Sequence, residues 1–193
     1  MVPNLFSLPA FPDLLRDESP ESEDFSIDSL NIYSNYMSTV DFREYNSEGF
    51  SLFSHNIRSL SSNFDDLVSL INSVKNKLDI LLLTESWVTE LTCDLLNLPG
   101  YNSFHIYRNA KKGGGVTFFT NDSLNCEQIK DSSYINKDIE LNTIKISNSN
   151  TDIYVFGVYR PPSGNIKKFL TYLENHLEKF KNKRIIFSGD PKY

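Results

Sequence analysis

Three polar residues that could do chemistry each follow a run of apolar residues. Asn56 closes F-S-L-F-S-H-N, Glu85 follows I-L-L-L-T, and Asp190 follows R-I-I-F-S-G. Such runs are typical of strands, and α/β proteins gather reactive groups at strand ends because the strand fixes the position while the loop leaves the tip open. Glu85 is the most suggestive, since a carboxylate on a buried strand is costly unless it is paired or bound to a metal. The alternatives are a cap of the following segment for Glu85 and a turn former for Asn56.

Strands and helices alternate from Phe50 onward, and these elements must position the three residues. Strands are predicted over 50–55, 79–83, 101–107, 116–120, 141–146, 153–159 and 184–188. Helices are predicted from the N-cap Asn63 to Leu78 and from Ile166 to Phe180, because apolar residues recur there on one helix face. The run of consecutive strands between the two helices predicts the α/β class and a layered sandwich.

The first 48 residues differ in composition from the rest of the chain. Residues 1–49 hold ten Asp or Glu and two Arg, a net charge of −8, whereas residues 50–193 hold fifteen acidic and seventeen basic residues, a net charge of +2. Prolines at four positions and the absence of a sustained period predict a flexible acidic leader over 1–48, with a short helix or docking motif as the alternative. The domain itself is predicted over 49–193, and its charge is compatible with phosphate contacts without requiring them.

Length and composition exclude several classes of protein. The 193 residues suffice for one domain, and 39% hydrophobic residues are typical of a globular chain. No apolar run approaches the ~20 residues of a membrane helix, and prolines interrupt the start where a signal peptide would be continuous. Cys93 and Cys126 are the only cysteines and are expected to be free. The expected compartment is reducing and intracellular, with the nucleus as a candidate.

Five short motifs occur in a recognisable order between Phe50 and Asp190. They are H-N-I-R-S-L, T-E-S-W, G-G-G-V, V-Y-R-P-P and S-G-D. In this order the chain resembles the endonuclease/exonuclease/phosphatase superfamily, most closely the apurinic-type endonuclease domains of jockey-like non-LTR retrotransposons. The resemblance implies two packed mixed β-sheets with outer helices, and Mg²⁺-dependent cleavage of phosphodiester or phosphomonoester bonds.

The resemblance also implies a role for each matching residue. Glu85 would hold the metal, Asn56 would help to order the site, and Tyr159 would present its hydroxyl to the scissile phosphate. Asp190 would align or deprotonate the attacking water. Arg160, beside Tyr159, could contact a DNA phosphate, with an ordinary surface arginine as the alternative. Mg²⁺ suits this set, because it takes oxygen ligands and needs only one or two carboxylates.

The chain departs from the family pattern near Asp190. Where the family has Gly-Asp-Phe-Asn, Pro191 and Lys192 follow Asp190, and the later Asp and the closing Ser-Asp-His motif have no counterpart. The expectation is therefore a domain that is incomplete at the C-terminus: a fragment of a Mg²⁺-dependent DNA-nicking endonuclease of retrotransposon type, inactive as given. The alternatives are a non-enzymatic remnant that binds nucleic acid or a protein partner and, less favoured, a phosphatase of the same superfamily.

Other features favour structural roles. The glycines at 113–115 precede a strand without nucleotide-loop spacing and predict a turn or a bulge at the start of that strand. His55, His105 and His176 lack metal-ligand spacing. Trp87, just after Glu85, could line the site or pack in the core.

Overall fold

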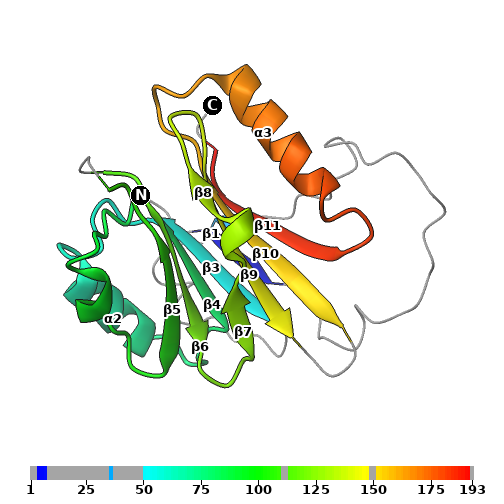
Figure 1. Cartoon of the computed structure of the whole chain (residues 1–193). Coiled ribbons are helices and arrows are strands. Elements are labelled where there is room, and N and C mark those ends of the chain that lie inside the picture. The colour runs from blue at the N-terminus through cyan, green and yellow to red at the C-terminus, as the bar shows by residue number, and fades with distance from the viewer. Residues whose placement is uncertain (1–3, 8–34, 37–49, 110–112, 148–150, 192–193) are drawn as a thin grey trace.

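The computed structural model describes residues 4–7, 35–36, 50–109, 113–147 and 151–191, which form two β-sheets (Figure 1). The first sheet has the order β2-β1-β3-β4-β6-β5 and the second the order β11-β10-β9-β7, with β8 beside β9. The first sheet comprises β1 (Asn4–Ser7), β2 (Asn35–Tyr36), β3 (Ser51–Asn56), β4 (Ile80–Thr84), β5 (Tyr101–Ile106) and β6 (Val116–Asn121). The second comprises β7 (Cys126–Gln128), β8 (Tyr134–Ile135), β9 (Glu140–Ser147), β10 (Asp152–Tyr159) and β11 (Arg184–Asp190). The helices are α2 (Phe64–Asn72) and α3 (Ile166–Glu178), with short 3₁₀ turns η3 (Cys93–Leu95) and η4 (Lys130–Ser132).

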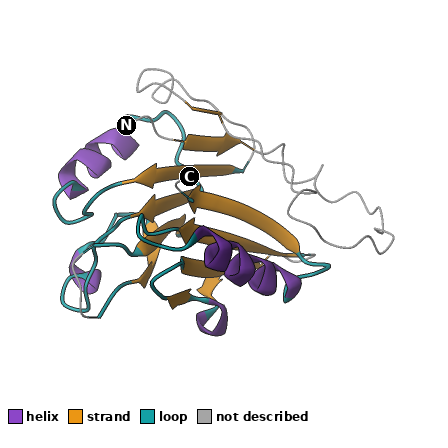
Figure 2. Cartoon of the chain, turned by 90° about the horizontal axis from the view of Figure 1, so that it is seen from above, coloured by secondary structure: helices purple, strands orange, loops and turns teal. Residues whose placement is uncertain are grey.

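Strand β4 shows how the sequence builds the layers. Successive side chains of a strand point to opposite faces. Ile80 and Leu82 accordingly pack with the second sheet, whereas Leu81 and Leu83 pack in the cluster that includes α2. The helix α3 covers the outer face of the second sheet, so that the helices lie outside and the sheets inside (Figure 2). The predicted α/β sandwich of two packed mixed sheets with outer helices is confirmed.

Gly157 in β10 lets the two sheets approach closely. A Cβ at this position would lie 2.6 Å from Cδ1 of Leu82 and 2.8 Å from Cζ of Phe118, both of which belong to the first sheet. Any larger residue would push the sheets apart, because protein cores are close-packed.

The first helix is shorter than the sequence predicts. It ends at Asn72 rather than Leu78, although Val74 and Leu78 beyond its end still pack against the same apolar cluster. The side chain of Asn63 makes no cap bond and instead donates to the carbonyl of Ile57 at 2.9 Å. The apolar period therefore continues past the helix because the following loop buries the same face.

Four strands were not predicted. β7 and β8 are two or three residues long, too short for a sequence period. β1 pairs antiparallel with β3, and β2 pairs with β1, so two short segments of the predicted leader lie at the edge of the first sheet. The rest of the leader lies outside the described residues, and the domain boundary near residue 49 stays a prediction.

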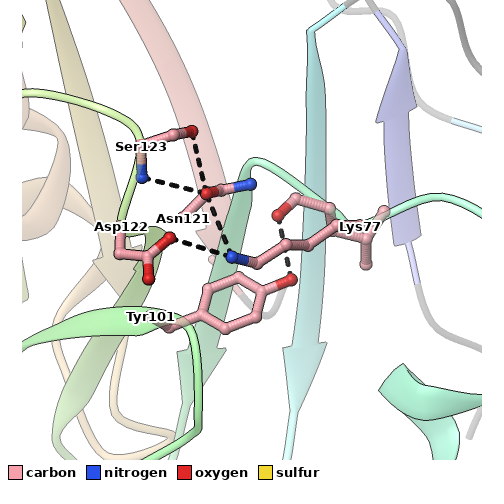
Figure 3. A network of polar contacts seen from close by, with 6 residues as sticks. Lys77, Tyr101, Asn121, Asp122 and Ser123 are labelled. Carbon is pink, nitrogen blue, oxygen red and sulfur yellow. Dashed lines mark hydrogen bonds and ion pairs between the residues drawn. The ribbon is translucent and has the colours of Figure 1, made fainter.

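A polar network secures the start of β4, at the end opposite Glu85 (Figure 3). Nζ of Lys77 lies 3.0 Å from Oδ1 of Asp122 and 3.2 Å from Oδ1 of Asn121. It also lies 5.0 Å from the centre of the Tyr101 ring, whose hydroxyl donates to the carbonyl of Leu78 at 2.9 Å. The segment before β4 is thereby tied to β5 and β6.

Cys93 and Cys126 are free thiols. Within the described parts of the chain, no helix has both the length and the apolar character needed to cross a membrane.

His176 on α3 is a buried core residue, and we expect it to make stability pH-dependent. It is 1% exposed, and its ring packs against Phe156 and Phe180. Burial, with a smaller contribution from Lys179, lowers its pKa to about 4. Because the folded pKa lies below the unfolded value of ~6.5, the stability is complete above pH 6.5 and is lost as the pH falls toward 4.

Between pH 7 and pH 5 this histidine should remove about 2 kcal/mol of unfolding free energy. Urea denaturation of the wild type and of His176→Leu at both pH values measures it, and the variant should lose less stability than the wild type. His105, whose pKa is also lowered to about 4, stays in both proteins, so the difference isolates His176. Equal losses in the two proteins would contradict the prediction.

Candidate active site

Two parallel strand pairs, one from each sheet, meet at the candidate site. β3 and β4 are parallel neighbours joined through α2, with Asn56 in register with Thr84. β10 and β11 are parallel neighbours joined through α3, with Tyr159 in register with Asp190. Parallel neighbours end at the same edge of a sheet, so each pair delivers two residues to one place. Residues from both pairs then face each other where the sheets pack.

The structure brings Asn56, Glu85, Tyr159 and Asp190 into one hydrogen-bonded group. The amide Nδ2 of Asn56 donates to Oε1 of Glu85 at 2.8 Å and to Oδ2 of Asp190 at 2.7 Å. The hydroxyl of Tyr159 donates to the same Oε1 of Glu85 at 3.1 Å. The sequence predicted Asn56, Glu85 and Asp190 at strand ends and placed Tyr159 in the motif V-Y-R-P-P, and the structure brings all four together; their chemical roles stay predictions.

The backbone at Glu85 adopts a conformation that non-glycine residues rarely take. Glu85 has φ +52° and Trp87 has φ +53°. Such residues persist where the surroundings hold them, and they gather at functional sites. Here the amide of Ser86 donates to the carbonyl of Gly115 at 3.2 Å and that of Trp87 to Gly114 at 2.9 Å. The glycines at 113–115, all with positive φ, lie directly before β6, and this segment, called the glycine turn below, supports the segment that carries Glu85.

The surroundings of Tyr159 are acidic. Burial raises the pKa of Tyr159 above its usual range, and Glu85, Glu140 and Asp190 raise it further. The phenol therefore stays protonated throughout the physiological range. A neutral tyrosine hydroxyl is a hydrogen-bond donor, which is the state required to approach a phosphate oxygen.

The oxygens of the group fit a hard divalent cation such as Mg²⁺. The side-chain carbonyl Oδ1 of Asn56 is buried and has no hydrogen-bond partner among the described residues. It belongs to the amide whose nitrogen contacts the carboxylates of Glu85 and Asp190. The described residues contain no group of three or more His, Cys, Asp or Glu suited to a metal. An amide oxygen and one or two carboxylates suit Mg²⁺, which keeps several of its waters.

Arg160 points into the protein rather than across its surface. It is 9% exposed, and its guanidinium donates to the carbonyls of Pro191 at 3.1 Å and Gly164 at 2.9 Å. Its backbone amide also donates to the carbonyl of Asp190 at 3.2 Å. These contacts brace the segment that carries Asp190, and the contact with DNA phosphate that the sequence suggested stays a prediction.

A third acidic residue near the group, Glu140, was not predicted from the sequence. Glu140 is fully buried and pairs with Arg108, and its charge is close enough to influence Tyr159. The signal was a glutamate between Ile139 and Leu141, directly before the strand predicted at 141–146, where an unpaired carboxylate would be costly if it were buried. The partner could not be read from the sequence because it lies 32 residues away.

Comparison of the sequence with models of known protein families gave no match, and comparison with curated proteins gave none either. The fold does match solved structures. The AP endonuclease LMAP from Leishmania major matches with a TM-score of 0.56 and 17% identity over 72% of this chain and 54% of that one. The endonuclease domain of TRAS1, a telomere-specific non-LTR retrotransposon, matches with a TM-score of 0.52 and 16% identity over 72% and 58%.

A truncated TDP2 from Caenorhabditis elegans matches with a TM-score of 0.51 and 17% identity over 72% of this chain and 60% of that one. At this level of identity the matches show the fold, which is that of the endonuclease/exonuclease/phosphatase group. The chain spans a little over half the length of these structures.

Proposed function

We propose that this chain carries the Mg²⁺-binding part of a DNA-nicking endonuclease site of the retrotransposon type. The observation that carries the proposal is the hydrogen-bonded group of Asn56, Glu85, Tyr159 and Asp190 at the meeting of two parallel strand pairs. The fold match supports it, because two of the matching structures are an AP endonuclease and a retrotransposon endonuclease domain. The motifs V-Y-R-P-P and H-N-I-R-S-L favour the mobile-element branch over a phosphatase.

In this proposal Glu85 and the carbonyl oxygen of Asn56 would hold Mg²⁺, with Asp190 beside them. When bound, the ion would neutralise the charge that builds on the phosphate oxygens. Tyr159 donates a hydrogen bond to a phosphate oxygen, for which its raised pKa keeps it protonated. Asp190 accepts a proton from the attacking water or orients it, and the amide of Asn56 fixes the distance between the two carboxylates.

Magnesium binding that depends on Glu85 is the first test. We expect Mg²⁺ to raise the melting temperature of the purified chain, because a ligand that binds only the folded state stabilises it. Glu85→Gln keeps the size of the side chain but removes its charge, and it should weaken Mg²⁺ binding at least tenfold in calorimetric titration. Glu90→Gln, an exposed glutamate five residues away, is the matched control and should bind as the wild type does.

Cleavage is tested separately on supercoiled plasmid DNA with Mg²⁺ or EDTA. Any nicking by the chain should require Mg²⁺ and should fall ~10²-fold or more in Glu85→Gln, because this carboxylate would hold the ion. Absence of Mg²⁺ binding, or nicking that is unchanged in Glu85→Gln, would overturn the proposal. Mg²⁺ and DNA binding without nicking would instead identify a nucleic-acid-binding module that does not hydrolyse its ligand.

A further inference from the structure

Glu140 is a buried carboxylate that the proposed chemistry does not use. It lies on β9 in register with Tyr159 of β10, between Ile139 and Leu141, and all three residues of this run are fully buried. A carboxylate in such surroundings is costly unless its charge is met and its oxygens are hydrogen-bonded.

Both oxygens of Glu140 have partners. Nε of Arg108 donates to Oε1 at 2.6 Å, and Nη2 of the same guanidinium forms an ion pair with that oxygen. The backbone amide of Gly115 donates to Oε2 at 2.5 Å. One oxygen therefore holds an arginine and the other holds the glycine turn at 113–115.

The glycine turn transmits the position of Glu140 to the segment that carries Glu85. The carbonyl of Gly115 accepts from the amide of Ser86, and the carbonyl of Gly114 accepts from the amide of Trp87. These two residues directly follow Glu85, whose left-handed backbone needs such support. One chain of hydrogen bonds thus runs from the second sheet, through the turn, to the candidate site.

The turn is fitted closely against the ion pair. A Cβ on Gly114 would lie 2.6 Å from Nε of Arg108 and would also collide with Oε1 of Glu140. A larger residue here would displace the ion pair and would strain the backbone, whose φ of +69° favours glycine. This explains the glycine run without a nucleotide-binding role.

We propose that Glu140 is a positioning residue for Glu85: together with Arg108 it anchors the glycine turn and so holds the Glu85 carboxylate against Asn56 and Tyr159. The inference rests on the proposed function, because the position of Glu85 matters to chemistry only if Glu85 binds the ion. A buried ion pair is weak evidence of stabilisation, since its desolvation offsets its attraction. A role in positioning accounts for its place beside the site.

Trp87 offers a readout that does not depend on activity. It is the single tryptophan of the chain, and its amide is bonded to the turn. Glu140→Gln removes the negative charge that pairs with Arg108. It also places an amide NH₂ group, which is a donor, where the Arg108 guanidinium or the Gly115 amide already donates. We expect its Trp87 fluorescence to be quenched about twofold more readily by acrylamide, and its Mg²⁺ affinity to fall about tenfold, as is usual when a ligand loses its support.

The matched control is Glu127→Gln. Glu127 forms an ion pair with Lys145 on the same strand β9, but its side chain is 59% exposed. This variant should keep the wild-type quenching and Mg²⁺ affinity, because it removes an ion pair without touching the turn. The same changes in Glu127→Gln as in Glu140→Gln would overturn the inference.

A second variant guards against misfolding of Glu140→Gln. Arg108→Lys keeps the positive charge but loses the fork of the guanidinium, so it should change both readouts in the same direction by a smaller factor. Wild-type quenching and Mg²⁺ affinity in a folded Glu140→Gln, or in Arg108→Lys, would overturn the inference. If the wild type binds no Mg²⁺, the proposed function fails, whereas the Trp87 readout still decides whether Glu140 positions the turn.

Discussion

Gly189→Ala is expected to destabilise the chain by about 3 kcal/mol or more, which is the cost of a backbone conformation and a collision that no relaxation of a side chain can relieve. Gly189 has φ +148°, a region that is open almost only to glycine. A Cβ here would lie 2.7 Å from the carbonyl carbon of Val158 and closer still to its oxygen. The two residues are paired in the parallel ladder of β10 and β11, so the clash separates the strands.

The substitution should also displace the Asp190 carboxylate from the candidate site, because Asp190 is the next residue after Gly189 on β11. Denaturant unfolding of the variant and the wild type gives the change in free energy. The control is Gly113→Ala, where φ is +101° but the nearest atom to the added Cβ is Nε1 of Trp87 at 3.8 Å. That variant should cost only about 1 kcal/mol, from the backbone alone. A Gly189→Ala protein as stable as Gly113→Ala would show that the strands can separate without penalty.

Asn56→Asp is the second substitution with a large expected effect. It replaces the shared amide donor by a third carboxylate within hydrogen-bond distance of Glu85 and Asp190. The hydrogen bonds to Glu85 and Asp190 would thereby be replaced by repulsion between carboxylates in a partly buried site. In EDTA at pH 7 we expect a loss of about 3 kcal/mol in unfolding free energy.

Two conditions, a lower pH and added Mg²⁺, should restore part of the unfolding free energy that Asn56→Asp loses. Crowded carboxylates have raised pKa values in the folded state, so the deficit grows as the pH rises through those values and shrinks as the pH falls toward 5. Mg²⁺ should also restore stability, and by more than it adds to the wild type. Asn102→Asp on β5 adds the same charge at an exposed position and should cost little under every condition. A deficit in Asn56→Asp that neither acid nor Mg²⁺ relieves would count against a cation site here.

The sequence predicted the parts of the fold that periodicity encodes. The apolar runs before Asn56, Glu85 and Asp190 predicted buried strands, and all three end where expected within two residues. Short strands such as β7 and β8 escaped because two or three residues carry no period. Helix α2 was predicted too long because Val74 and Leu78, which lie in the loop after the helix, pack against the same apolar cluster, and a helical period cannot distinguish the two cases.

The candidate site also has a part that the sequence predicted and a part that it did not. Asn56, Glu85 and Asp190 were found because each stands at the end of a predicted strand, and Tyr159 was found through the motif V-Y-R-P-P. Their convergence depends on which strands are parallel, and that is a property of the whole sheet. Glu140 and Arg108 escaped because an ion pair across 32 residues leaves no local pattern. The left-handed backbone at Glu85 also has no signature in the sequence, since the turn that supports it is supplied by a distant segment.

The spacing of the site residues along the chain has a consequence for folding. The bond between Asn56 and Glu85 joins residues 29 apart and can form within the unit of β3, α2 and β4. The bond between Tyr159 and Glu85 spans 74 residues, and that between Asn56 and Asp190 spans 134. Such non-local contacts form slowly, because the loop that they close costs entropy before any contact rewards it. We therefore expect the bond between Asn56 and Glu85 to form first and the bonds of Glu85 with Tyr159 and of Asn56 with Asp190 to form only when one strand–helix–strand unit docks onto the other.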